Sequence, residues 1–323
     1  MSLFWSTSSD SRYYNQETLT HLKAQWNSNI VRIPMAVENG GYVNNSQVEY
    51  GKVKAVIEGA ISVGMYVIVD WHTERADLYV DEATKFFSNI SKTYGSNPHI
   101  IYEIWNEPNR FVNWTMIKSY AQQVIPAIRA NDPNNIIIVG TPIFSQLVNE
   151  AADDPLSFPN IAYTLHYYAG SHKQELRDIA TYAINKSLPI FVTEYGVVNY
   201  TENGPIYPYE SKIWWNFLDE NKISYVNWAV SNNDPTWNPF NTGAGAFVEN
   251  TTPEQVGYPS RWSISGKFVN AKYQNYDQGF KGYPTYAYNN SCAVLNQNSG
   301  SWTNQDCGAV LTDSTCYICG LGL

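Results

Sequence analysis

The sequence predicts an α/β protein, a (β/α)8 TIM barrel followed by a small cysteine-containing tail. Short runs rich in β-branched residues recur along the chain with helical patterns between them, which is typical of βαβ units and a parallel sheet. The runs are apolar almost throughout, as strands buried on both faces should be. All four cysteines lie in the last tenth of the chain, which sets that segment apart from the rest.

The predicted strands and helices alternate. The strands are expected at Asn29 to Ile33, Tyr66 to Asp70, Ile100 to Ile104, Asn135 to Val139, Ile161 to Leu165, Ile190 to Thr193 and Tyr225 to Ala229. The helices are expected at Gln16 to Gln25, Val48 to Val63, Glu82 to Tyr94, Thr115 to Ala130, Lys173 to Asn185 and Tyr209 to Asn221, with one short helix around Ser145 to Ala152.

An eighth strand would have to run into the first residues of the chain. We expect Met1 to Trp5 to lie along the barrel beside Ile30 to Ile33 and to close it, with only the end of that strand present. The alternative is an open, doubly wound sheet, but the glycine-rich fingerprint of the dinucleotide-binding form is missing from the sequence.

Composition limits the partners. The 323 residues carry 20 Lys and Arg against 29 Asp and Glu, a net charge of −9, which argues against nucleic acid and anionic membranes. No apolar stretch approaches the roughly 18 residues of a membrane helix. Aromatic residues make up 15% of the chain, as much as all charged residues together. That surplus of flat faces suits stacking on sugars.

The cysteines of the tail indicate that the protein folds in an oxidising compartment. An even set of cysteines in a Gly-, Asn- and Ser-rich stretch favours two disulfides in a secreted protein, with the signal peptide already removed. We expect Cys316 and Cys319 to bond different partners among Cys292 and Cys307, because a bond between residues three apart is strained. A metal knuckle is the rival, but no His follows His172. The predicted units are therefore 1–270, the catalytic barrel, and 271–323, a disulfide-bearing extension.

Polar side chains follow the predicted strands where each strand ends. In a barrel the chemistry lies at that end, so these groups are expected to converge. Two of them, Glu107 and Glu194, directly follow buried strands, unlike most glutamates, which are solvated on helix surfaces. A pair of carboxyl groups is what hydrolysis of a glycosidic bond needs, one as acid and one to attack or stabilise the anomeric carbon.

Four segments carry a resemblance to a known family. They are Ile101 to Pro108 (IYEIWNEP), Val67 to His72 (VIVDWH), His166 to His172 (HYYAGSH) and Pro189 to Gly196 (PIFVTEYG). In their order along the chain they resemble the strand-end motifs of glycoside hydrolase family 5, the cellulase family of bacterial-type endo-β-1,4-glucanases. The resemblance covers roughly residues 1 to 270 and leaves the tail unexplained.

The resemblance implies a retaining endo-β-1,4-glucanase that acts by double displacement, with Glu107 as general acid/base and Glu194 as nucleophile. It implies that Asn106 binds the 2-hydroxyl of the sugar and that Arg32 supports the nucleophile and lowers its pKa. The remaining implied substrate contacts are His72, which meets a sugar hydroxyl, His166 and Tyr168, which orient Glu194, and Trp228 and Trp5, which stack on sugars.

Some alternatives stay open. Each supporting residue could instead be structural: Arg32 in an ion pair, His72 in the core, and Trp228 and Trp5 in packing. After Trp228 the basic and acidic residues that touch substrate in the family have no obvious counterpart, although Trp237 could offer a stacking face. Mannan or xyloglucan could therefore replace β-glucan and cello-oligosaccharides as substrate, and a non-catalytic carbohydrate-binding barrel is a further alternative. We expect a monomer and no cofactor. No HExxH motif marks a catalytic metal site, and no G-x-S-x-G motif marks a serine nucleophile.

Overall fold

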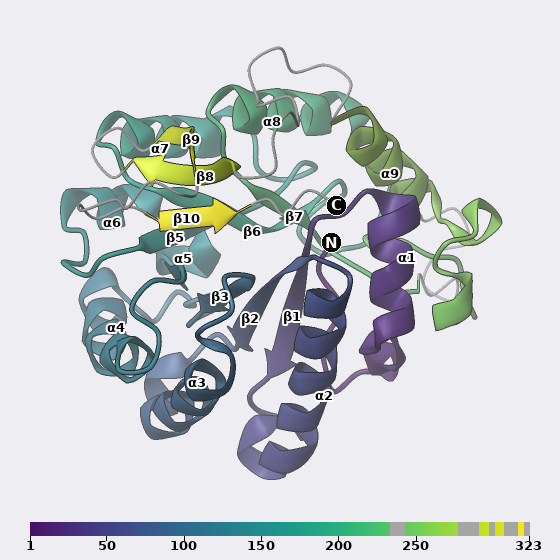
Figure 1. Cartoon of the computed structure of the whole chain (residues 1–323). Coiled ribbons are helices and arrows are strands. Elements are labelled where there is room, and N and C mark those ends of the chain that lie inside the picture. Colours follow the sequence, from purple (N-terminus) through teal and green to yellow (C-terminus); the bar gives the residue numbers. More distant parts are fainter. Residues whose placement is uncertain (233–242, 277–290, 297–300, 307–315, 320–323) are drawn as a thin grey trace.

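The strands of the computed structural model run parallel in one seven-stranded sheet, in the order of the chain (Figure 1). The structure describes residues 1–232, 243–276, 291–296, 301–306 and 316–319. Nearly every strand residue is buried, which is why the strands are apolar runs in the sequence. The strands are β1 (Ile30–Ala36), β2 (Tyr66–His72), β3 (Ile100–Glu103), β4 (Ile137–Val139), β5 (Ile161–Tyr168), β6 (Ile190–Gly196) and β7 (Tyr225–Asn227).

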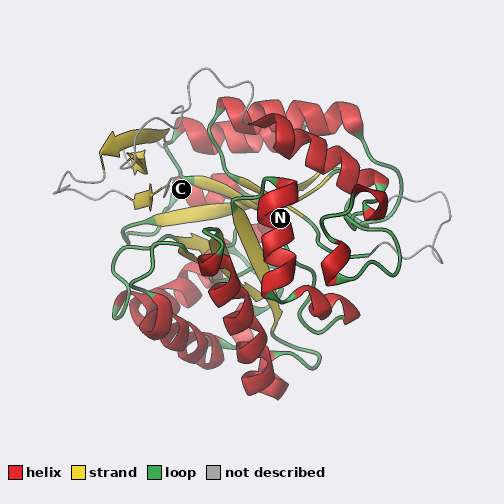
Figure 2. Ribbon diagram, turned by 45° about the vertical axis from the view of Figure 1, so that its right-hand side comes forward, coloured by secondary structure: helices red, strands yellow, loops and turns green. Residues whose placement is uncertain are grey.

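Helices surround these strands, and every crossing from one strand to the next passes through at least one helix (Figure 2). The helices are α1 (Gln16–Trp26), α2 (Tyr42–Ser62), α3 (Val80–Tyr94), α4 (Trp114–Arg129), α5 (Pro142–Ser145), α6 (Val148–Asp153), α7 (Gln174–Asn185), α8 (Pro208–Glu220) and α9 (Ile264–Tyr276). Short 3-10 turns occur at Ser9–Tyr13, Ala76–Leu78, Pro253–Gln255 and Pro259–Arg261.

The helices depart from the prediction in three places. Helix α2 begins earlier than the expected Val48, and the added turn is separated from the rest by a kink at Asn45. The gap after β4 holds two short helices, α5 and α6, where one was expected. Helix α9 was not predicted, and it runs continuously through residue 270, where the boundary between barrel and tail was expected.

The first residues of the chain close the barrel as expected. The backbone N–H of Ser2 donates to the carbonyl of Asn227 at the end of β7 (2.8 Å), and the N–H of Leu3 donates to the carbonyl of Arg32 in β1 (2.9 Å). Ser2 and Leu3 also form parallel bridges with Arg32 and Val230. Residues 1–3 therefore occupy the position of an eighth strand between β7 and β1, and the (β/α)8 barrel is confirmed.

Strand periodicity divides the barrel interior into an apolar and a polar layer. Near the start of the strands, buried residues from successive strands form a separate apolar cluster: Ile68, Ile101, Ile136, Ile138, Ala162, Phe191 and Val226. Because side chains alternate between the two faces of a strand, the residue two positions later points the same way. Two positions after Ile68, Ile101 and Phe191 stand Asp70, Glu103 and Thr193, all fully buried. The polar layer thus lies toward the carboxyl ends of the strands.

The tail contains a second, three-stranded antiparallel sheet in the order β10-β8-β9. Its strands are β8 (Ser291–Asn296), β9 (Ser301–Asp306) and β10 (Cys316–Cys319), and Cys292 stands opposite Cys319 in the register of β8 and β10. Cys307 lies outside the described residues, as does Trp237, so the two expected disulfides stay a prediction. No helix in the described part of the chain has the length and apolar character to cross a bilayer.

Candidate active site

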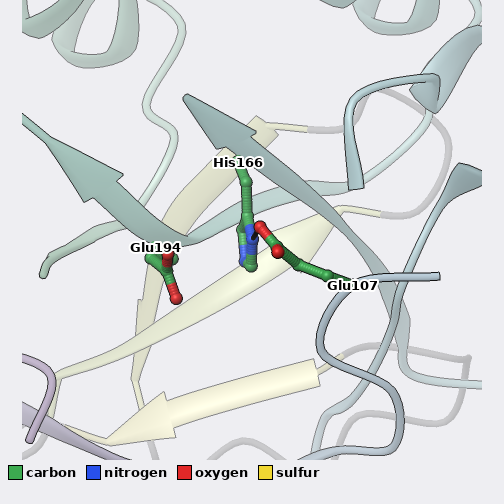
Figure 3. A group of neighbouring side chains, drawn as sticks. All are labelled: Glu107, His166 and Glu194. Carbon is green, nitrogen blue, oxygen red and sulfur yellow. Dashed lines mark hydrogen bonds and ion pairs between the residues drawn. The ribbon is translucent and has the colours of Figure 1, made fainter. Parts of the chain in front are cut away.

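The side chains expected at the site from the sequence lie in one connected set of contacts on the barrel strands and the segments beside them. Arg32 from β1 contacts Glu194 from β6 and Asn106 from the loop after β3. Tyr168 from β5 contacts Glu194 as expected, whereas His166 from β5 hydrogen-bonds to Glu107 instead of the expected Glu194. The aromatic rings of Trp5, His72 and Trp228 pack against one another. In Figure 3, His166 lies between the two glutamates and its ring is turned to Glu107.

Glu194 is held at both carboxylate oxygens. The guanidinium of Arg32 donates to Oε2 (2.9 Å), and the hydroxyl of Tyr168 donates to Oε1 (2.6 Å). The side chain is only 6% exposed. Burial raises the pKa of the Tyr168 hydroxyl well above its usual value, and Glu194 raises it further, so Tyr168 keeps its proton and acts as a donor. Both partners stabilise the ionised form of Glu194, the form that a nucleophile requires.

Glu107 stands in a different environment. Its only side-chain hydrogen bond in the described part of the chain joins Oε1 to Nδ1 of His166 (2.8 Å). Burial raises the pKa of Glu107 to about 8; Arg32 opposes this shift, while Glu74 and other carboxyl groups add to it. Glu107 therefore carries its proton at neutral pH, as a general acid must, and its side chain is 23% exposed, more than that of Glu194.

The separation of the two carboxyl groups bears on the reaction. One oxygen of Glu107 and one of Glu194 lie within 4.8 Å of each other. Retaining glycosidases hold their carboxyl groups about 5–5.5 Å apart, whereas inverting enzymes need about 6.5–9.5 Å to admit a water molecule. The spacing matches direct attack by a carboxylate on the sugar.

A buried ion cluster lies beneath Glu194. Arg32, fully buried, forms ion pairs with Asp70 (3.0 Å) and Glu103 (2.7 Å) as well as with Glu194. Although burial opposes its charge, these carboxylates raise the pKa of Arg32, which stays a cation. One positive charge cannot compensate three buried negative charges, and burial raises the pKa of Asp70 to about 8 and that of Glu103 as well.

Asp70 and Glu103 were missed from the sequence, although a signal for them exists. Each is a charged residue at an inward position of an otherwise apolar strand, two residues after a member of the apolar layer. A buried carboxyl group in such a position needs a partner, and the fully buried Arg32 in β1 pairs with both. Their polar contacts position Arg32, Asn106 and Glu194 relative to one another.

His72 and Trp228 are buried more deeply than the sequence suggested. Nδ1 of His72 contacts Oδ2 of Asp70 (2.6 Å), and burial lowers the pKa of His72 to about 3, so the ring is neutral. Trp228 is 2% exposed, lies parallel to His72 at 5.6 Å and donates from its indole N–H to Glu202 (2.9 Å). Trp5 is 37% exposed and stands edge-on to His72, so it offers the more accessible aromatic face.

Glu202 is a further residue that sequence reasoning missed. It lies in the loop after β6 with φ of 61°, a left-handed conformation that non-glycine residues rarely adopt. Burial raises its pKa to about 7; its bond from Trp228 opposes this, while Glu194 and Glu107 raise the pKa further. No sequence motif marks Glu202, because its position depends on the path of a loop that the strand pattern does not determine.

The short segment α5 after β4 braces the turn that carries Glu107. Ile143, Phe144 and Ser145 all have left-handed φ values, between 54° and 57°. The hydroxyl of Ser145 donates to the backbone carbonyl of Asn106 (2.6 Å), and the N–H of Phe144 donates to the carbonyl of Pro108 (2.8 Å). Strained backbone of this kind persists where surrounding contacts hold it, often at functional sites.

Among the described residues, one group of three His, Cys, Asp or Glu side chains has ligand atoms close enough to hold a metal ion. This group is Glu107, His166 and Glu194. Both ring nitrogens of His166 have protein partners, Glu107 and Thr193, and both oxygens of Glu194 have partners as well. These contacts suit acid–base chemistry. The expectation of a reaction without a metal stays a prediction.

Comparison with known proteins identifies the same family that the sequence motifs resemble. The family model described as Cellulase (glycosyl hydrolase family 5) matches residues 1–234. The chain is 46% identical over 234 residues to endoglucanase Z of Dickeya dadantii, covering 71% of this chain and 55% of that protein. It is 45% identical over 222 residues to an endoglucanase of Clostridium saccharobutylicum, covering 68% and 50%. The chain thus spans about half the length of the curated relatives it matches.

Solved structures match over most of the chain. A structure from Cytophaga hutchinsonii superimposes with a TM-score of 0.81 at 42% identity, covering 85% of this chain and 87% of that chain. An endoglucanase catalytic domain from Thermobifida fusca gives a TM-score of 0.77 at 33% identity, covering 85% and 90%. A variant of the latter, solved in complex with cellotetraose, gives a TM-score of 0.77 at 32% identity, covering 85% and 90%.

Proposed function

The chain belongs to glycosyl hydrolase family 5, and from that premise we propose that it is a retaining endo-β-1,4-glucanase. The observation that carries the proposal is the approach of Glu107 and Glu194 to within 4.8 Å, with only Glu194 paired to a cation. The raised pKa of Glu107 makes that carboxyl group the acid, and the cation beside Glu194 marks that carboxyl group as the nucleophile, as double displacement requires.

In the first step, the Glu194 carboxylate attacks the anomeric carbon while Glu107 gives its proton to the leaving oxygen. The glycosidic C–O bond breaks and an ester bond forms between the sugar and Glu194. In the second step, Glu107, now ionised, removes a proton from water, and the resulting oxygen nucleophile attacks the anomeric carbon from the opposite face to Glu194. The ester breaks, Glu194 returns to its ionised form, and the product has the starting configuration.

Neighbouring side chains assist each step. Oδ1 of Asn106 accepts from Arg32, which leaves the amide N–H groups of Asn106 to donate to the 2-hydroxyl of the reacting sugar. Such a bond strengthens in the transition state and lowers the barrier. His72, whose Nδ1 is held by Asp70, turns its Nε2 to a sugar hydroxyl, and Trp5 supplies an exposed stacking face.

β-1,4-Glucan is the substrate that the relatives favour. Endoglucanase Z and the Thermobifida fusca protein are named endoglucanases, and a variant of the latter was solved with cellotetraose. The same scaffold acting on mannan or xyloglucan is the alternative. Reducing-end release from carboxymethyl-cellulose, β-mannan and xyloglucan, measured side by side, tests the proposal: we expect the highest kcat/KM on the glucan, and faster mannan hydrolysis would overturn the substrate assignment.

We also propose that the protein acts as a secreted monomer and that its four cysteines form two disulfides. The separate small sheet, in which Cys292 stands opposite Cys319, supports one of these bonds, because Cα atoms of paired strands are about as far apart as disulfide geometry requires. A mass measurement with and without reduction tests this: two disulfides lower the mass by four hydrogen atoms, and four free thiols would contradict it.

A further inference from the structure

A hydrogen-bonded chain of four side chains, three of them buried, connects Glu103 to Glu107. The hydroxyl of Thr193 contacts Oε1 of Glu103 (2.6 Å) and Nε2 of His166 (2.9 Å), and Nδ1 of His166 contacts Oε1 of Glu107 (2.8 Å). Thr193 and Glu103 are fully buried and His166 is 2% exposed. Thr193 takes no part in the two catalytic steps described above, so its place in this series of hydrogen bonds needs a physical explanation.

The direction of the hydrogen bonds follows from where the negative charge lies. Arg32 donates to both oxygens of Glu103, at 2.7 and 3.3 Å. Asp70, which also pairs with Arg32, has one oxygen with no hydrogen-bond partner in the described residues. An unpaired buried oxygen is far costlier on a carboxylate than on a neutral acid, so Glu103 carries the charge in preference to Asp70.

An ionised Glu103 can only accept hydrogen bonds, so the single hydroxyl proton of Thr193 points to Glu103. The hydroxyl oxygen of Thr193 must then accept from its other neighbour, Nε2 of His166. Burial lowers the pKa of His166 to about 4, so the ring is neutral at neutral pH and carries one proton. That proton is on Nε2, which leaves a lone pair on Nδ1.

We propose that Thr193 is a positioning residue that holds His166 in the Nε2–H tautomer, so that the Nδ1 lone pair faces the acid/base Glu107. A protonated Glu107 donates to this lone pair, whereas an ionised Glu107 would face it without a proton between them. Thr193 thereby favours the protonated acid in the first step and makes the ionised carboxylate a stronger base in the second. The inference rests on the proposed function for these two roles of Glu107.

Other charged groups around these hydrogen bonds cannot set the tautomer of His166 in place of Thr193. Glu107 is exposed to the fields of Arg32, Asp70, Glu74, Glu103 and Glu202, and His166 to those of Glu194, Arg32, Glu103 and His72. These fields act on the charge of each group. None of them donates to or accepts from a ring nitrogen of His166 within hydrogen-bond distance, so the tautomer is left to Thr193 and Glu107.

Nitrogen NMR of the imidazole-labelled protein tests the tautomer without any substrate. The two nitrogens of a neutral ring have widely separated shifts, and the His166 signals are identified by their loss in His166→Gln. We expect the protonated nitrogen of His166 to be Nε2 in the wild type and in Thr193→Ser, with Nδ1–H gaining population in Thr193→Val. An Nδ1–H tautomer in the wild type would overturn the proposal whatever the enzyme hydrolyses.

The pH dependence of kcat/KM on cello-oligosaccharides gives the functional readout. Loss of the acceptor in Thr193→Val should lower the apparent pKa of Glu107 and move the basic limb to lower pH by about 0.5–1 unit, with little change in KM. Thr193→Ser should restore the wild-type profile. On an activated aryl cellobioside, whose leaving group needs no proton, kcat/KM should be unaffected.

Thr164→Val is the matched control. Thr164 is also a fully buried threonine at an inward position of the barrel, but its hydroxyl has no hydrogen-bond partner in the described residues. We expect the basic limb of the kcat/KM profile of Thr164→Val to stay at the wild-type pH. An equal displacement in Thr164→Val and Thr193→Val, or none in Thr193→Val, would overturn the positioning role; a wild type that hydrolyses no β-glucan would instead overturn the proposed function and leave the tautomer result standing.

Discussion

One arginine serves three carboxyl groups at the centre of this site. Arg32 is fully buried and pairs with Asp70, Glu103 and Glu194. Breaking a buried ion pair by removing one partner leaves uncompensated charge in a medium that solvates it poorly. At the residue scale, therefore, stability and the ionised state of the nucleophile depend on the same guanidinium.

Replacing this guanidinium should affect both properties. In Arg32→Met we expect the free energy of unfolding to fall by about 3–5 kcal/mol and kcat to fall by about 10²-fold or more. Denaturant titration and steady-state kinetics measure the two effects. Lys54→Met is the control, because Lys54 and Glu58 form an exposed pair, and it should change stability by less than about 1 kcal/mol. Equal effects of the two substitutions would contradict the role of Arg32.

The two glutamates should respond differently to truncation. Glu107→Ala should lose about 10²–10⁴-fold on cello-oligosaccharides yet retain a fast first step on an activated aryl glycoside, because general-acid help scales with leaving-group basicity. Glu194→Ala should lose both activities. With azide, Glu194→Ala should give an inverted glycosyl azide and Glu107→Ala a retained one. The opposite pair of products would exchange the two roles.

At the scale of elements, the strands could be predicted and their irregularities could not. All seven expected strands are present, since an apolar, β-branched run is a strong local signal. Thr193 and Glu194, however, are consecutive, and a regular strand would point them to opposite faces. Both face the interior because the pairing of β6 with β7 shifts register between Val192 and Tyr195. Such a bulge re-aims a side chain and leaves no mark in the sequence.

Close packing between β5 and β6 leads to a second element-scale prediction. A Cβ on Gly196 in β6 would collide with the ring of Tyr168 in β5, whose hydroxyl donates to Glu194. Gly196→Ala should therefore displace that hydroxyl and lower kcat by about 10–100-fold, as Tyr168→Phe should. Gly51→Ala in α2, where a Cβ meets open space, should leave kcat unchanged. Wild-type kcat in Gly196→Ala would show that the Tyr168 contact is dispensable.

At the scale of the whole molecule, the barrel places a polar layer above an apolar one. The sequence predicted which strand ends converge, because parallel strands bring their carboxyl ends to one edge. It did not predict that Asp70 and Glu103 belong to the site, since the strand pattern shows that each is buried but not that both pair with Arg32 of another strand. It did not predict Glu202 either, which a loop of irregular backbone delivers.

The protonated state of Glu107 should be visible in the pH dependence of stability. Its pKa is about 8 in the fold but near 4.5 in the unfolded chain, so between these values the folded state holds a proton that the unfolded state has lost. This contribution to stability is complete below pH 4.5 and is lost as pH rises to 8. The free energy of unfolding of the wild type, relative to Glu107→Gln, should therefore fall over that range, and a constant difference would contradict the raised pKa.

The anomeric configuration of the first product tests the central claim most directly. Proton NMR during hydrolysis of a cello-oligosaccharide by the wild type records which anomer appears before mutarotation mixes the two. Oxygens of Glu107 and Glu194 within 4.8 Å leave no room for a water between the carboxyl group and the sugar, so we expect the β-anomer first. Initial release of the α-anomer would contradict double displacement and the assignment of Glu194 as nucleophile.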